Sequence, residues 1–192
     1  MALPETHLRV TVQGVAGWDV VHFSVREELS VLYEASLIVT HDDPESDPSA
    51  MLGQTAVVTI DREGAVTHRL QGVVRALEDL GTTATQRYAR LYVVPWLWTL
   101  SQRSDSRIFQ EMPAVEIVSA VLRAAGVYDG THGRLVAADA LTKLPPREYC
   151  VQYRETDLDF VLRLLQEEGV PFYFRHDEDG GETLVLAEDD HP

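Results

Sequence analysis

The distribution of apolar and β-branched residues over the first hundred positions is the feature that most constrains this fold. These residues come in short runs separated by turn-forming clusters, a pattern that predicts consecutive β-strands. The predicted strands are Leu8–Val12, Val20–Arg26, Leu32–Thr40, Ala56–Asp61, His68–Leu80 and Gln86–Leu97. Six strands without intervening helices predict a closed or nearly closed antiparallel β-barrel, because closure hides the strand edges.

Turn signals separate these strands. The acidic, proline-containing cluster from Asp42 to Pro48 is predicted to be a loop, and Glu63-Gly64 and the segment 81–84 are typical of hairpin connections. The pair Trp96 and Trp98 falls on one face of the last predicted strand and is interpreted as core.

Helical spacing begins only after residue 107. Apolar residues three and four apart predict a helix over residues 113–125, between Pro113 and Gly126. Residues 128–146 carry little periodicity and are interpreted as a connection. A strand over 148–154 then precedes a second helix over 156–168, with Thr156 as N-cap and a predicted buried stripe of Leu158, Val161, Leu162 and Leu165.

Two more strands are predicted over 171–175 and 183–187, joined around Asp179-Gly180. The second helix is expected to pack on one sheet that contains 148–154 and 171–175. Three strands cannot close a barrel, so the last strand is expected to present an unpaired edge. The predicted division is residues 1–105 as a first barrel, 106–147 as helix and connection, and 148–192 as the incomplete start of a second barrel.

The charge of the chain excludes one class of partner. It has 31 acidic residues against 16 Lys and Arg, a net charge of −15, which would repel phosphate backbones. We therefore expect no nucleic acid partner. Cys150 is the single cysteine and is interpreted as a buried structural thiol. Residues 1–10 do not predict a signal peptide, and the apolar run 91–102 is too short to predict a membrane anchor.

Catalytic patterns are mostly missing from the sequence. It contains no nucleophile elbow, zinc-helix motif, phosphate-binding loop or Cys-x-x-Cys pair, and this favours a protein without catalytic residues, cofactor or metal. The candidates for a metal site are His176–Glu182, His41-Asp42-Asp43 and Asp189-Asp190-His191, and each is interpreted as a solvated loop. A metal-dependent hydrolase that uses these acidic loops stays open as an alternative of another class.

One set of short motifs has its centre in the segment from Tyr149 to Asp157, which Glu167-Glu168-Gly169 and the aromatic run 172–174 follow. Further motifs of the set lie upstream and include Gly72-Val73-Val74, the run 95–100 and the run 107–110. In composition and order these motifs resemble the VgrG family of type VI secretion spike proteins. The residues carried over as family-motif positions with a structural role are Arg107, Phe109, Tyr149, Gln152, Tyr153, Glu155, Thr156, Asp157, Arg163, Glu168 and Gly169.

This resemblance implies a structural hub and spike protein that is not an enzyme. The implied fold is that of the phage tail hub, with two related barrels per chain. The implied partners are two further copies in a homotrimer, the hexameric tube protein Hcp, and a spike tip and effectors bound through C-terminal regions. It also implies assembly in a bacterial cytoplasm and export by the type VI machinery without a signal peptide. The hub of a contractile phage tail is the alternative.

The family's neck and spike have no counterpart before Pro192. Because the last strand is expected to present an unpaired edge, weak or irregular self-association of this chain is expected in place of a stable closed trimer. The motif residues also have ordinary structural interpretations. Arg163 is spaced to pair with Asp159 and Glu167 on a solvated helix face, or else to join strand to helix. Aromatic residues at alternating strand positions are interpreted as core or barrel wall. They are Tyr149, Tyr153, Phe172 and Tyr173.

Overall fold

The computed structural model describes residues 6–62, 65–130, 132–177 and 181–188. Its contacts divide the chain into two compact units, Met1–Glu27 with Tyr33–Pro95, and Glu28–Leu32 with Trp96–Pro192. The boundary after Pro95 lies earlier than the expected boundary at residue 105. The reason is a 3-10 helix, η2 (Trp96–Gln102), whose Leu97 and Leu100 are buried in the core of the second unit.

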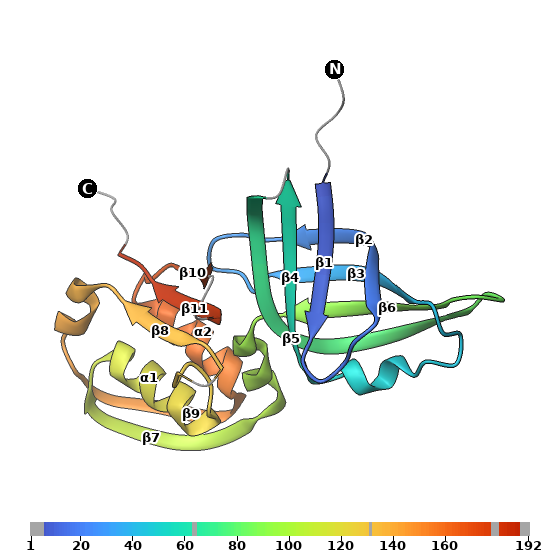
Figure 1. Cartoon of the computed structure of the whole chain (residues 1–192). Helices are drawn as coiled ribbons and strands as arrows, with labels where there is room; N and C mark the ends of the chain where they lie inside the picture. The colour runs from blue at the N-terminus through green and yellow to red at the C-terminus, as the bar shows by residue number, and fades with distance from the viewer. Residues whose placement is uncertain (1–5, 63–64, 131, 178–180, 189–192) are drawn as a thin grey trace. The chain divides into compact units, whose positions relative to one another are not determined.

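The first unit is one antiparallel sheet of six strands, as the sequence predicts. In chain order the elements are β1 (Thr6–Val12), β2 (Trp18–Arg26), β3 (Glu34–His41), the 3-10 helix η1 (Pro48–Met51), β4 (Thr55–Arg62), β5 (Ala65–Thr82) and β6 (Arg87–Val94). The strand order is β1-β4-β5-β6-β3-β2, so β1 and β2 are the two edges of a curled half-barrel (Figure 1). The predicted hairpin at 81–84 joins β5 to β6, whereas Glu63-Gly64 lies outside the described residues.

A glycine lies where β5 changes partner. The strand pairs with β4 up to Val73 and with β6 from Val73 onward, and Figure 1 shows it bending between these two parts. A Cβ atom on Gly72 would lie 2.2 Å from the carbonyl oxygen of Val94 and 2.4 Å from the hydroxyl of Tyr33. Buried Tyr33 donates that hydroxyl to the carbonyl of Gln71. The absence of a side chain at residue 72 therefore lets neighbouring backbone and ring come close.

The second unit contains two helices and two small sheets. After η2 its elements are β7 (Ser104–Met112), α1 (Ala114–Ala125), β8 (Arg134–Ala137), the 3-10 helix η3 (Asp139–Lys143), β9 (Arg147–Thr156), α2 (Asp157–Glu167), β10 (Phe172–Asp177) and β11 (Gly181–Leu186). β7 and β9 form an antiparallel ribbon of two strands, and the other sheet has the order β10-β11-β8. Both predicted helices are confirmed. α1 ends at Gly126, whose φ of 71° is left-handed, and Thr156 caps α2.

Several expectations about the second unit are wrong. β7 and β8 were not predicted as strands, and α1 shares one core with α2. β9 and β10 belong to different sheets, so α2 does not pack on one sheet that contains both. The last strand is also no edge. β11 is the central strand, antiparallel to β10 and parallel to β8. The proposed hairpin pair Asp179-Gly180 lies outside the described residues.

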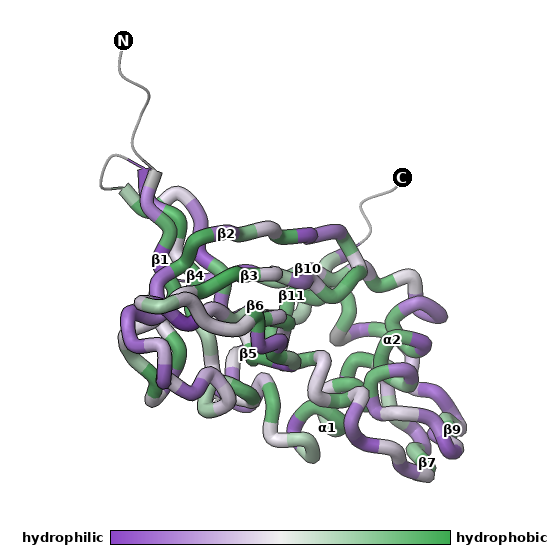
Figure 2. The backbone as a smooth tube through the Cα atoms, turned by 90° about the vertical axis from the view of Figure 1, so that its right-hand side faces the viewer, coloured by the Kyte–Doolittle hydropathy of each residue, from purple (hydrophilic) through white to green (hydrophobic). Residues whose placement is uncertain are grey.

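The buried stripe of α2 is rotated from the predicted one. Val161 and Leu165 are buried as expected, but Leu158 and Leu162 are only partly buried, and Phe160 and Leu164 take their places in the core. α1 contributes the matching apolar face and is largely green in Figure 2. The expected strand position of Trp96 and Trp98 is wrong, because both lie in η2. No helix among the described residues is long and apolar enough to cross a membrane.

Candidate functional site: a polar junction of β7, β9 and α2

Antiparallel pairing of β7 and β9 brings motif residues from two parts of the chain together. Arg107 lies opposite Gln152, and Phe109 lies opposite Cys150. Side chains alternate between the two faces of a strand, so these residues share the face that points toward α1 and α2. Cys150 and Gln152 are buried accordingly, and the interpretation of Cys150 as a buried thiol is confirmed.

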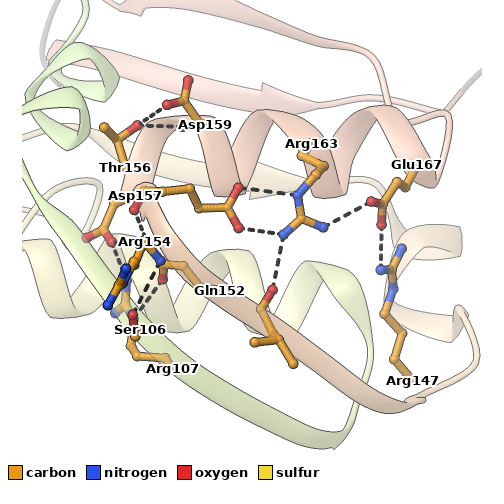
Figure 3. Close-up of polar contacts among 12 residues, drawn as sticks. Ser106, Arg107, Arg147, Gln152, Arg154, Thr156, Asp157, Asp159, Arg163 and Glu167 are labelled. Atoms are coloured by element: carbon orange, nitrogen blue, oxygen red, sulfur yellow. Dashed lines mark hydrogen bonds and ion pairs between the residues drawn. The ribbon is translucent and has the colours of Figure 1, made fainter.

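Three motif side chains form the polar junction, which we define as Arg107, Gln152 and Asp157 (Figure 3). The Nε atom of Arg107 donates to Oε1 of Gln152 over 2.9 Å, and its Nη2 atom donates to Oδ1 of Asp157. Gln152 Nε2 donates to the same Oδ1 atom over 2.8 Å and to the backbone carbonyl of Glu155 over 3.3 Å. Each of the three elements β7, β9 and α2 thus supplies one side chain to a single closed set of bonds.

The carboxylate of Asp157 is fully buried, although it belongs to the first turn of α2. Its Oδ2 atom lies 3.5 Å from Nε of Arg103, and its backbone N–H donates to the carbonyl oxygen of Arg103 over 2.9 Å. Burying a charge is costly unless it is paired and hydrogen-bonded. Here Arg107 and Gln152 donate to Oδ1, whereas Oδ2 has the ion pair with Arg103 and accepts no hydrogen bond within the described residues. The N-terminus of a helix also favours a negative charge. The junction therefore fixes where α2 begins relative to the ribbon.

Two aromatic rings, one from β7 and one from α2, stack on the core side of the ribbon. The ring of Phe109 stacks on that of Phe160 from α2, with ring centroids 5.8 Å apart. Thr156 caps the helix by accepting from the backbone N–H of Asp159 over 3.0 Å, and its hydroxyl donates to the Asp159 side chain over 2.7 Å. The motif residues Phe109 and Thr156 thus support the same strand-to-helix corner as the polar junction.

Arg163 joins strand to helix, which is the second of the two interpretations left open by the sequence. It donates to Glu155 over 2.6 Å and to the carbonyl oxygen of Val151 over 3.1 Å, both on β9. It also bonds to Glu167, four residues along α2, over 3.0 Å. The expected pairing with Asp159 is wrong, because that side chain is occupied by the cap at Thr156.

A second arginine extends this charged cluster at the far end of the helix. Arg147, at the start of β9, donates to Glu167 over 2.7 Å and to Glu168 over 2.9 Å. The bond from Arg147 and the weaker contribution of Arg163 lower the pKa of the Glu167 carboxyl. The bond to Glu167 raises the pKa of the Arg147 guanidinium, and the bond to Glu155 raises the pKa of the Arg163 guanidinium. Gly169, with a left-handed φ of 65°, follows and ends the helix.

Two motif aromatics lie on the opposite face of the ribbon. Tyr149 is 56% exposed and Tyr153 is 66% exposed, so the interpretation of these residues as core is wrong. Tyr173 on β10 is also exposed, and only Phe172 is buried as expected. The error arises because alternation identifies two faces of a strand without saying which one the core covers.

The metal-site candidates are not brought together in the described part of the chain. There, no group of three or more His, Cys, Asp or Glu side chains could hold an ion. His41 Nδ1 accepts from the backbone N–H of Asp43 over 2.9 Å, and Asp43 accepts from Glu45, so these side chains close the loop after β3. The run His176–Glu182 is described only in part, and Asp189-Asp190-His191 lies outside the described residues.

Sequence reasoning missed Arg103 and Arg147 as members of the site. Neither belongs to a motif, and each acts through a partner that lies far along the chain. Arg103 meets Asp157, and Arg147 meets Glu167 and Glu168. The one available signal was the excess of acids on α2 and its flanks, which implies basic partners on a neighbouring element.

A curled antiparallel half-barrel followed by this α+β unit is an architecture of tail-hub proteins, and comparison with solved structures supports that class. The E. coli c3393 protein, described as a component of the type VI secretion system with structural similarity to T4 bacteriophage tail proteins, matches with a TM-score of 0.82. Its identity to this chain is 25%, and the match covers 95% of this chain and 49% of that one.

Sequence comparison gives the family. The model described as phage tail baseplate hub (GPD) matches residues 26–192, and the chain belongs to that family. The type VI secretion system spike protein VgrG1b of Pseudomonas aeruginosa is 32% identical over 98% of this chain and 25% of its own length. VgrG3 of Vibrio cholerae is 40% identical over 65% of this chain and 12% of its own length. The resemblance to VgrG proteins is confirmed. The chain spans between 12% and 25% of the length of these curated relatives.

Proposed function

We propose that this chain is the hub portion of a type VI secretion spike protein and acts by assembly, without catalysis. The observation that carries the proposal is the 32% identity to a spike protein along 98% of the chain. Short motif matches can arise in unrelated proteins, whereas a match through both units requires the same succession of strands and helices. The c3393 protein, with the same fold, is described as a component of this secretion system.

The polar junction supports a structural role for the motif residues. Arg107, Gln152 and Asp157 bond to one another inside the second unit, and Asp157 is fully buried. A catalytic group has to reach a substrate, and this carboxylate reaches none. The junction is suited to keeping ribbon and helix rigid under load, as a hub that transmits force requires. The described residues give the alternative of a metal-dependent hydrolase no support.

The proposed assembly is a homotrimer of the full-length protein that caps a hexameric Hcp tube. Three chains that each contribute two related barrels would present six similar units to six tube subunits. The spike tip and effectors would bind through regions beyond this chain, and the complex would assemble in the bacterial cytoplasm before export. The three-part division of the chain into a first barrel, a connection and the start of a second barrel remains part of this proposal.

The test uses the full-length protein in its own bacterium. Deletion of its gene should abolish release of Hcp into the medium, and complementation with the intact gene should restore release. Complementation with a gene that lacks residues 1–192 should fail. Light scattering on the purified full-length protein should give the mass of three chains. Undiminished Hcp release after the deletion, in a strain without a second spike gene, would refute the secretion role.

A contractile phage tail is the second candidate, because the matching family is described as a phage tail baseplate hub. Affinity purification of the full-length protein separates the two. A spike protein should bring down Hcp, whereas a phage hub should bring down a tail tube protein encoded in a prophage. Recovery of the phage tube protein alone would replace the first proposal by the second.

A further inference from the structure

The loop that follows β3 closes around one nitrogen of an imidazole ring. Nδ1 of His41, the last residue of β3, accepts from the backbone N–H of Asp43 over 2.9 Å. The hydroxyl of Ser46 lies 2.8 Å from the same nitrogen, and the backbone N–H of Ser46 donates to the carbonyl oxygen of Asp43 over 3.2 Å. Residues 42–47 therefore turn back onto the His41 side chain.

The other ring nitrogen of His41 faces the turn between β1 and β2. A Cβ atom on Gly17 would lie 2.5 Å from Nε2 of His41, so only a residue without a side chain lets the ring come this close. The ring of buried Trp18, the first residue of β2, has its centroid 5.3 Å from that of the imidazole. One side chain thus joins two loops of the first unit, residues 13–17 and residues 42–47. We call this arrangement the imidazole latch.

The bond from Asp43 fixes the protonation state of the latch. A backbone N–H can only donate, so Nδ1 of His41 has to offer its lone pair, and the neutral ring carries its proton on Nε2. A proton added at Nδ1 would point at the N–H of Asp43, and two donors would face each other. Histidine side chains ordinarily change charge between about pH 5 and pH 8. The closed loop therefore excludes a proton that a free histidine takes up in mild acid.

Charged groups on the strands that pack against the ring largely cancel. Arg87 of β6 lies opposite His41 and bonds to Asp79 of β5. Trp18 lies opposite His41 on β2, and the neighbouring Asp19 is exposed. Residues 13–17 contain no charged side chain. The strands and the turn therefore leave the sign of the local field to the loop itself.

The loop is acidic, and its field favours a positive ring. Its four carboxylates belong to Asp42, Asp43, Glu45 and Asp47. In the described part of the chain none of them bonds to the imidazole. Three accept from other groups instead, namely the side-chain amide of Gln86 over 3.2 Å, the backbone N–H of Glu45 over 3.0 Å and the backbone N–H of Ser49 over 2.8 Å. Charge thus favours proton uptake by His41, and the hydrogen bond from Asp43 opposes it.

We propose that His41 is an acid-sensitive latch, in which protonation of Nδ1 breaks the bond from Asp43 and frees the loop 42–47. One proton is taken up from solvent, and no covalent bond between heavy atoms changes. The Ser46 hydroxyl can turn to accept from the new N–H, whereas the backbone N–H of Asp43 cannot change its role. Since the open loop binds the proton and the closed loop excludes it, acid favours the open form. This inference concerns the first unit alone and does not depend on the proposed function.

Nuclear magnetic resonance of the 192-residue chain tests the latch residue by residue. Between about pH 8 and pH 5 the ring signals of His41 should titrate, and the amide signals of Asp43 and Gly17 should shift with the same midpoint. The hydrogen exchange rate at Asp43, divided by its intrinsic rate at each pH, should rise about five- to tenfold as one hydrogen bond is lost. The amide of Gly126, in the second unit, is the internal reference and should not respond. A corrected exchange rate at Asp43 that stays constant over this range, whether or not the ring titrates, would overturn the proposal.

His41→Asn is the matched variant, because it keeps an acceptor and removes the titration. An asparagine side chain accepts from the backbone N–H two residues further along the chain, which here is that of Asp43, and its amide does not bind a proton. The loop of this variant should stay closed at both ends of the pH range. The control is His22→Asn, which removes an exposed histidine of β2 and should retain the full acid response. A response of wild-type size in His41→Asn would assign the opening to the carboxylates of the loop, and loss of the response in His22→Asn would assign it to another histidine. Either result refutes the latch.

Discussion

Arg107 and Asp157 lie fifty residues apart in sequence and bond directly, at a carboxylate that solvent does not reach. Their elements are a strand of the ribbon and the first turn of α2, so one bond joins the two parts of the second unit. Gln152, from the strand between them in the chain, bonds to both. Because an unpaired buried charge is costly, substitutions at this point should have large effects on stability.

Replacing Asp157 by alanine should lower the free energy of unfolding by about 3 kcal/mol. The substitution leaves Arg107, only one-fifth exposed, without its buried counter-charge, and breaking such a pair is strongly destabilising. Asp157→Asn, which keeps the shape and one acceptor, should cost less. Urea denaturation measures both. The matched control is Asp177→Ala, which removes an exposed pair with Arg175 and a hydrogen bond of 3.4 Å from Thr183, and it should cost under about 1 kcal/mol. Equal losses for the buried and the exposed aspartate would contradict this account.

Two leucines of α2 should differ in their contribution to stability. Leu164→Ala removes a fully buried side chain and should cost about 3 kcal/mol, whereas Leu158→Ala removes a partly buried one and should cost about 1 kcal/mol. Chemical denaturation of both variants beside wild type gives the comparison. The reverse order would mean that the stripe predicted from sequence, and not the rotated one, faces the core.

The periodicity of apolar residues predicted the position of α2 but not which of its faces is buried. The spacing of apolar residues located α2 and its cap at Thr156 correctly, because a helix start and a 3.6-residue repeat are local properties. The direction of the stripe depends on Asp157, which is drawn into the core by Arg107 and Arg103 from distant parts of the chain. A pattern that counts only apolar residues places Asp157 on the solvent-facing side of α2. The predicted stripe was therefore rotated away from the face that is buried in the structure.

Gly72→Ala should destabilise the first unit by about 3 kcal/mol, because the new methyl group would overlap the Val94 carbonyl and the Tyr33 hydroxyl. Thermal or urea melts report the loss. Gly53→Ala is the comparison. A Cβ there meets no atom within 4 Å, and only its left-handed φ of 76° opposes the change, at a cost of about 1 kcal/mol. A tolerated alanine at residue 72 would show that the corner of β5 has room.

Acid should weaken the charged cluster around Glu167. The bond from Arg147 holds the pKa of this carboxyl below its ordinary value of 4.5. The folded state then binds fewer protons than the unfolded state, so the contribution is complete above pH 4.5 and is lost as the pH falls through the lowered pKa. The urea midpoint of Glu167→Gln should fall less between pH 6 and pH 3 than that of wild type. Glu148→Gln, which removes an exposed carboxylate of the ribbon, controls for the loss of one negative charge.

The members of the candidate site were predictable to different degrees. The family resemblance supplied Arg107, Gln152 and Asp157 by position, but only pairing of β7 with β9 brings them together, and β7 was not recognised as a strand. Its residues 104–107 are mostly polar, so they lack the apolar signal of a buried strand. β8 was missed because it is only four residues long and its partner, β11, lies far along the chain.

The position of β11 has a consequence for how the protein is made. β8 pairs in parallel with β11, Arg134 opposite Thr183, and β10 needs the same strand on its other side. A chain emerging from the ribosome can complete the six strands of the first unit early. In the second unit, α1, β8 and β10 are synthesised before β11, and the sheet that contains β8 and β10 cannot form until β11 has been made. Residues 28–32 also depend on a late segment, because Ser30 accepts a hydrogen bond from the backbone N–H of Phe172, which is synthesised 142 residues later. Synthesis that ends before residue 181 should therefore release a folded first unit attached to an exposed, unfinished core, which is the form that chaperones and proteases recognise.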